Sequence, residues 1–123
     1  MSVTPDEVLA LARELYNGGN ASEARVRSSI SRAYYAAYHS AVACAGVELP
    51  SLEAHRALID RYDSLGKIAL AGRLRSMRAA RVTADYYLSR PVAGKQASIS
   101  LSQAVEIINE LQPPPLPKAQ LNK

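Results

Sequence analysis

The chain has 123 residues and a mass of 13.3 kDa, which suits one domain with a single hydrophobic core. Hydrophobic residues make up 48% and charged residues 21%, a globular composition that excludes an intrinsically disordered chain. A single cysteine excludes a disulfide framework and a cysteine-based zinc site. No apolar run has the length of a membrane span and the N-terminus lacks a signal-peptide core, so we expect a cytoplasmic protein without membrane contact.

The formal net charge of +4 is concentrated in one segment of the chain. Residues 67–90 hold six basic side chains and a single acid, Asp85, and therefore carry +5. Most of the cations are arginines, whose planar guanidinium forms paired hydrogen bonds with phosphate. A basic helix is usually only a solvated surface, so the charge allows an anionic partner without requiring one.

The first predicted helix begins at Pro5. Thr4 is its expected N-cap, and Glu7 completes a capping box with it. The glycine pair at residues 18–19 ends this helix, because glycine readily takes the left-handed conformation found after helix C-termini.

A second cap signal, Asn20 with Glu23, opens a long alanine-rich helix that is expected to reach Gly46. Ser51 then caps a third helix, which ends near Gly66.

The fourth predicted helix covers residues 68–88, and the last one opens at Ser98 after a loop. No segment alternates at period two for long enough to indicate a strand. The sequence therefore predicts an all-α protein of four or five helices. We expect residues 1–112 to form one helical domain and the proline-rich residues 113–123 to be an extended, disordered tail.

The second predicted helix has an apolar stripe and a polar face. The stripe is formed by residues at helical spacing: Ile30, Tyr34, Ala37, Ala41 and Cys44. Small residues on several sides of this helix indicate that several neighbours approach it closely, so we expect it to be central.

Arg32 and His39 lie two turns apart on the polar face of the same helix, with Tyr35 beside them. A guanidinium can hold a phosphoryl oxygen and an imidazole can exchange a proton near neutral pH, so one interpretation is a phosphate clamp with a general base. The alternative is structural: Arg32 pairs with an acid of another helix, and His39 bonds a tyrosine hydroxyl.

Arg81 lies within an apolar stripe of the fourth predicted helix, where an unpaired guanidinium is costly. Asp85 follows four residues later and is within reach of it. The pair is either a structural contact between helices or part of a phosphate-binding site. His55, on an apolar face of the third predicted helix, is expected to be a satisfied half-buried histidine or a site residue.

Three segments together resemble the HEPN-domain family of small prokaryotic helical bundles. Residues 31–41, SRAYYAAYHSA, look like the family's central helix, and residues 53–56, EAHR, match a histidine that often opens the next helix. Residues 81–86, RVTADY, are similar to its Arg-x-x-Ala-Asp-Tyr signature. The likeness extends over residues 5–112, nearly the whole chain.

The resemblance implies an antiparallel bundle that forms a homodimer and is commonly encoded beside a minimal nucleotidyltransferase. Many relatives are toxins or defence proteins that cleave RNA without a metal ion or cofactor, using an arginine and a histidine near the dimer interface. In this chain no histidine follows Arg81, and the pair Arg32 and His39 lies on a different helix from the usual motif. A non-catalytic binding module, or a partner subunit of a nucleotidyltransferase, is therefore the alternative function.

The hypothesis of an RNA-cleaving protein assigns roles to two groups of residues. The expected catalytic residues are Arg32, His39 and Arg81. The expected RNA- or nucleotide-binding residues are Tyr35, His55, Arg78, Asp85 and Tyr86. No metal ligands are expected.

Overall fold

The computed structural model describes residues 3–45 and 54–111, and within these residues it contains helices and no strands. The elements follow in the order α1 (Pro5–Tyr16), η1 (Asn17–Gly19), α2 (Glu23–Ala45), α3 (Ala54–Ser64), α4 (Ile68–Tyr86) and α5 (Gly94–Leu111). The predicted all-α fold is confirmed. The predicted cap at Ser51 and the predicted tail, residues 113–123, lie outside the described residues.

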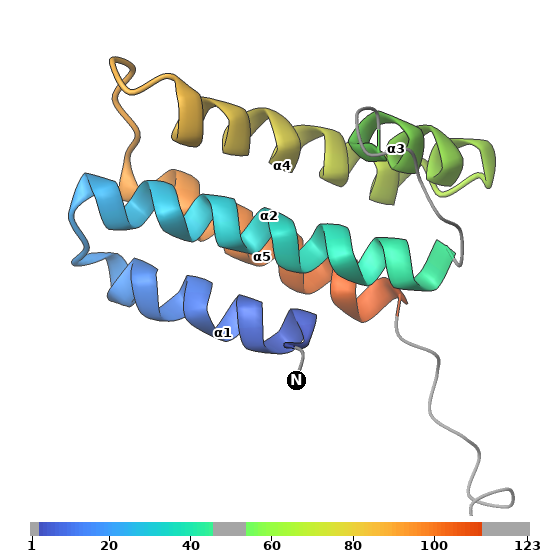
Figure 1. Cartoon of the computed structure of the whole chain (residues 1–123), viewed down its shortest axis with the longest axis horizontal. Coiled ribbons are helices and arrows are strands. Elements are labelled where there is room, and N and C mark those ends of the chain that lie inside the picture. The colour runs from blue at the N-terminus through green and yellow to red at the C-terminus, as the bar shows by residue number, and fades with distance from the viewer. Residues whose placement is uncertain (1–2, 46–53, 112–123) are drawn as a thin grey trace, which may run out of the picture.

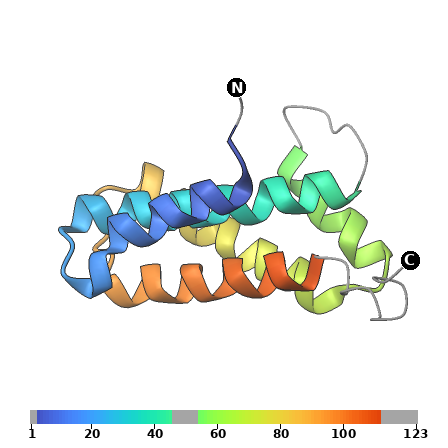
Figure 2. The same ribbon diagram turned by 90° about the horizontal axis from the view of Figure 1, so that it is seen from below.

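The long helices form a bundle in which α2 and α5 lie between α1 on one side and α4 on the other (Figure 1). The chain reverses direction between α1 and α2 and again between α4 and α5, so that α2 and α5 run the same way (Figures 1 and 2). The shorter α3 packs against α4 and against α2. None of the described helices combines the length and the hydropathy needed to cross a membrane.

The helix α1 begins and ends as the sequence predicts. The backbone N–H of Glu7 donates to Thr4 Oγ1 at 3.2 Å, and the backbone N–H of Thr4 donates to Glu7 Oε1 at 3.1 Å, which completes the capping box. At the other end Asn17 takes the left-handed conformation, with φ of 51°, and Gly18 and Gly19 also have positive φ.

The helix α2 begins later than predicted. Its N-cap is Ser22, whose hydroxyl accepts from the backbone N–H of Arg25 at 3.4 Å and whose carbonyl accepts from Val26 at 2.9 Å. Asn20 does not cap it, because α2 begins three residues further on at Glu23. The backbone N–H of Asn20 instead closes a turn onto the carbonyl of Asn17 at 3.1 Å.

The helix α5 begins at Gly94, a turn earlier than the predicted start at Ser98. The reason is a cap that the sequence analysis did not identify. Gln96 Oε1 accepts from the backbone N–H of Ala93 at 2.8 Å, while the backbone N–H of Gln96 donates to the Ala93 carbonyl at 3.0 Å.

The core surrounds α2, which contacts each of the other α-helices. Four alanines of this helix are fully buried and allow the close approach, as predicted: Ala33, Ala36, Ala37 and Ala41. Ile30 and Tyr34 are buried as well. Cys44 is exposed, however, so the end of the predicted stripe is wrong. It lies in the last turn of α2, where its thiol donates to the carbonyl of Leu111 at the end of α5 at 3.2 Å, beside a surface hollow.

A buried arginine joins the start of α2 to the end of α4. Arg27 is 7% exposed, and its guanidinium donates to the carbonyls of Thr83, Ala84, Tyr87, Leu88 and Arg90. Thr83 and Ala84 belong to the last turn of α4 and the other three residues follow it. The carbonyls of Thr83 and Tyr87 also accept from the backbone N–H groups of Tyr87 and Arg90. The contact ends α4 at Tyr86 rather than at residue 88 as predicted, and Leu88 is 72% exposed.

Candidate functional site

Two helices supply the side chains of the candidate site. On α2, Tyr34 and Tyr38 share one face, and Tyr35 and His39 share the adjoining face, because residues four apart lie one above the other. On α4, residues 78, 81 and 85 recur at helical spacing and face α2. The packing of α4 on α2 brings these groups together.

Arg81 is the centre of the site. Its Nη2 donates to the hydroxyl of Tyr35 at 2.6 Å, and its guanidinium carbon lies 5.1 Å from the Tyr35 ring centroid and 5.4 Å from that of Tyr86. Its Nε lies 3.0 Å from Asp85 Oδ2, so the predicted ion pair is present. The side chain is 14% exposed, and it is held by three different residues.

The carboxylate of Asp85 also binds α2, because Oδ2 accepts from the hydroxyl of Ser31 at 3.1 Å. The Nε–H of Arg81 is not aligned for a hydrogen bond with this carboxylate despite the short distance, so the attraction is ionic. We refer to Tyr35, His39, Arg81, Asp85 and Tyr86 as the Arg81 cluster.

His39 belongs to this cluster through Tyr35. The two rings are stacked, with centroids 6.1 Å apart and an angle of 25° between their planes. His39 and Arg81 therefore contact the same tyrosine, one at its ring and the other at its ring and hydroxyl. Tyr86 presents an exposed ring beside them, 66% accessible to solvent.

His55 is on α3 and lies among tyrosines of α2, next to the cluster. Its Nδ1 is 2.5 Å from the hydroxyl of Tyr34, and its ring centroid is 4.4 Å from that of Tyr38. Burial lowers the pKa of His55 below its ordinary value, and the charges of Arg78, Arg81 and His39 lower it further. Burial raises the pKa of Tyr34, so the tyrosine is protonated and donates to a neutral His55.

The lowered pKa of His55 predicts how stability depends on pH. Below its ordinary value near 6.5, the unfolded chain binds a proton at His55 that the folded chain resists. The free energy of unfolding should therefore be highest above this pH and should decrease as the pH falls below it. Urea denaturation between about pH 5 and 8 measures the effect.

The variant His55→Asn should flatten this pH dependence, whereas His39→Asn should retain it because His55 is still present. An unchanged slope in His55→Asn would contradict the assignment.

The structure does not bring Arg32 into the Arg81 cluster. Arg32 is exposed and lines a hollow against α1, together with Glu7 and the apolar side chains Val8 and Leu11. Among the described residues Arg32 forms no ion pair and His39 forms no hydrogen bond to a tyrosine, so the structural alternatives predicted for both are absent there. Both residues are exposed on α2, and of the two only His39 contacts the cluster, through the ring of Tyr35.

Arg78 faces His55 closely enough to lower its pKa, and it also lines a hollow between α3 and α4. The sequence analysis did not identify the other polar side chains of that hollow: Arg56, Asp60 and Arg75. The spacing of Arg75 and Arg78 was a signal for them, because residues three apart share a helix face. The sequence analysis also assigned Tyr34 only to the core, although the hydroxyl of Tyr34 reaches His55.

Comparisons with protein-family models, with curated proteins and with solved structures find no match for this chain. The HEPN resemblance therefore remains a prediction from residues 31–41, 53–56 and 81–86.

Proposed function

We propose that the protein is a HEPN-type toxin or defence protein that binds RNA or nucleotides through the Arg81 cluster. The observation that carries the proposal is the position of the Arg81 guanidinium, 5.1 and 5.4 Å from the ring centroids of Tyr35 and Tyr86. Stacked guanidinium and aromatic groups are the means by which proteins bind unpaired bases and neighbouring phosphates. The charge of +5 over residues 67–90 favours a polyanion in the neighbourhood of α4.

The exposed ring of Tyr86 is the natural stacking surface for a base, because one face is accessible while Arg81 lies at the other. Arg81 is held in place by Tyr35 and Asp85, so little side-chain entropy is lost when it meets a phosphate.

Metal-independent cleavage of RNA is the reaction we propose for this cluster. Arg81 would bind the phosphate and stabilise the charge that develops on it. His39 would accept the proton of a ribose 2′-hydroxyl. The 2′-oxygen bonds to phosphorus as the bond to the 5′-oxygen breaks, water protonates the leaving oxygen, and a cyclic phosphate remains.

A second candidate function is a non-catalytic RNA- or nucleotide-binding module, including a partner subunit of a nucleotidyltransferase. Two observations favour it: the charge of Arg81 is already paired with Asp85, and Arg32 lines a hollow on the α1 side of α2. Both reduce the number of free cations at the phosphate.

Two exposed tyrosines provide a matched test of RNA binding. Tyr86 belongs to the Arg81 cluster, whereas the neighbouring Tyr87 stacks on Arg90, 4.5 Å from its ring centroid. The variant Tyr86→Ala should weaken binding of a labelled single-stranded RNA by about tenfold, since each base stack contributes about 1–3 kcal/mol. Tyr87→Ala should change it by less than about twofold. Equal losses in both variants, or none in either, would refute the binding face.

The same labelled RNA, incubated with EDTA, tests the reaction. The variant His39→Ala should reduce cleavage at least about 100-fold while RNA affinity is retained, because a general base contributes rate rather than binding. Its exposed position leaves the fold undisturbed. If the wild-type protein binds the RNA and leaves it intact, the second candidate is the function.

The homodimer, which rests on the resemblance, and the cytoplasmic location, which rests on the sequence analysis, are part of this proposal. A nucleotidyltransferase is the proposed protein partner.

A further inference from the structure

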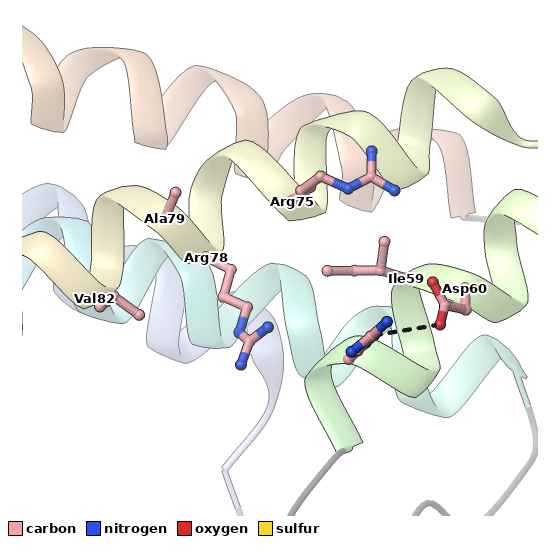
Figure 3. A pocket seen from close by; sticks show the side chains of 7 residues that line it. Ile59, Asp60, Arg75, Arg78, Ala79 and Val82 are labelled. Atoms are coloured by element: carbon pink, nitrogen blue, oxygen red, sulfur yellow. Dashed lines mark ion pairs between the residues drawn. The ribbon is translucent and has the colours of Figure 1, made fainter.

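We infer that the hollow between α3 and α4 binds a phosphomonoester that carries an apolar ring. The whole ligand would have the size of a nucleoside monophosphate. The hollow has a volume of about 580 Å³, which lies within the usual range of small-molecule sites. Its polar side chains are Arg56, Arg75, Arg78 and Asp60 (Figure 3). It shares no residue with the Arg81 cluster, so the inference does not depend on the proposed function.

The charge of the hollow matches a phosphomonoester. Three arginines face one aspartate, which leaves a net charge of +2. A phosphomonoester carries about −1.5 to −2 at neutral pH, whereas a carboxylate carries only one negative charge. The guanidinium groups are also suited to forked hydrogen bonds with phosphate oxygens.

Two of the arginines are free to make these bonds. Arg75 and Arg78 lie three residues apart on one face of α4, and among the described residues neither has an ion-pair partner. Arg56 lines the same hollow from α3 and is 3.9 Å from Asp60, a long and exposed contact that stabilises little. A phosphate between the two helices would give Arg75 and Arg78 the anionic partner that they lack.

The floor of the hollow indicates the rest of the ligand. It is apolar and consists of Ile59 from α3 with Ala79 and Val82 from α4. Such a surface packs against a flat or apolar ring. Asp60 at the rim accepts hydrogen bonds, so it favours a ligand with hydroxyl groups between ring and phosphate.

The test is calorimetric titration of the full chain with adenosine 5′-monophosphate, and with adenosine and inorganic phosphate as the two halves of that probe. The intact nucleotide should bind at least about tenfold more tightly than either half, because both parts of the hollow are then filled. No binding of the nucleotide at concentrations up to ~1 mM would overturn the inference.

Matched variants locate the site. Arg75→Gln should weaken the nucleotide at least about fivefold, the effect of losing one charge-assisted contact. Arg13→Gln, which removes the same charge from an exposed position on α1, should change it by less than about twofold. Equal losses in the two variants would show non-specific charge attraction and overturn the inference. Tyr86→Ala is read out with the labelled single-stranded RNA and Arg75→Gln with the nucleotide, so a failed RNA-binding face and a failed hollow are distinguishable.

A spectroscopic measurement gives a second criterion. Burial and, after it, the charge of Arg78 lower the pKa of His55, which is also faced by Tyr34, Tyr35, Tyr38, His39 and Arg81. A phosphate bound to Arg78 offsets that charge, so the nucleotide should raise the pKa of His55 in an NMR titration. Adenosine, which lacks the phosphate, should not. A pKa that does not move with the nucleotide would remove Arg78 from the site.

Discussion

The variant Arg27→Met is expected to lower the free energy of unfolding by about 3 kcal/mol or more, since the carbonyls of Ala84, Leu88 and Arg90 lose the guanidinium and Glu23 loses its ion-pair partner. In the native protein the guanidinium donates to Ala84 at 2.9 Å and to Thr83 and Tyr87 at 3.3 Å. Methionine fills a similar space without a donor, so the main loss is hydrogen bonding rather than packing. Urea denaturation followed by circular dichroism measures it.

Arg25→Met is the matched control for this variant. Arg25 lies two residues earlier and is exposed, and its side chain donates to a single carbonyl, that of Glu14, at 2.9 Å. It should cost less than about 1 kcal/mol. Arg27→Lys should fall between the two, because an ammonium keeps the charge but cannot reach several carbonyls as the fork does. A loss in Arg27→Met no larger than that of the control would contradict the capping role.

The sequence predicted the parts of the fold that depend on neighbouring residues. The capping box of Thr4 and Glu7 needs only three residues of spacing, and it is present. The role of Arg27 was not predictable in this way, because the carbonyls that it binds are 56–63 residues further along the chain. The only local sign was its position seven residues before Tyr34, on the buried side of α2.

In the candidate site, too, contacts within one helix were predictable from the sequence and contacts between helices were not. The Arg81–Asp85 pair was predictable because residues four apart on one helix are neighbours. The hydrogen bond from Arg81 to Tyr35 and the bond between Tyr34 and His55 depend on how α4 and α3 pack on α2, which residue spacing does not determine. For the same reason the spacing of Arg32 and His39 could not indicate that only His39 joins the cluster.

Asp85→Ala tests whether the pair with Arg81 is structural. Exposed ion pairs contribute about 0–1 kcal/mol, whereas breaking a fully buried pair costs about 3–5 kcal/mol. Asp85 is 27% exposed and Arg81 14%, so we expect an intermediate loss of about 2 kcal/mol in the free energy of unfolding. Asp60→Ala removes an exposed carboxylate from a pair of the same spacing and should cost less than about 0.5 kcal/mol.

The variant Asp85→Ala should raise the affinity for RNA although it lowers the free energy of unfolding. Asp85 compensates the charge of Arg81 and repels phosphate, so its removal frees one cation at the proposed binding face. RNA affinity should therefore rise at low salt, and the dependence of affinity on salt should steepen by about one counterion. A fall in stability without this gain would mean that Arg81 holds α4 against α2 and does not meet RNA. Equal stability of Asp85→Ala and the wild type would instead exclude the structural role, because a half-buried guanidinium that loses its partner without cost is already solvated.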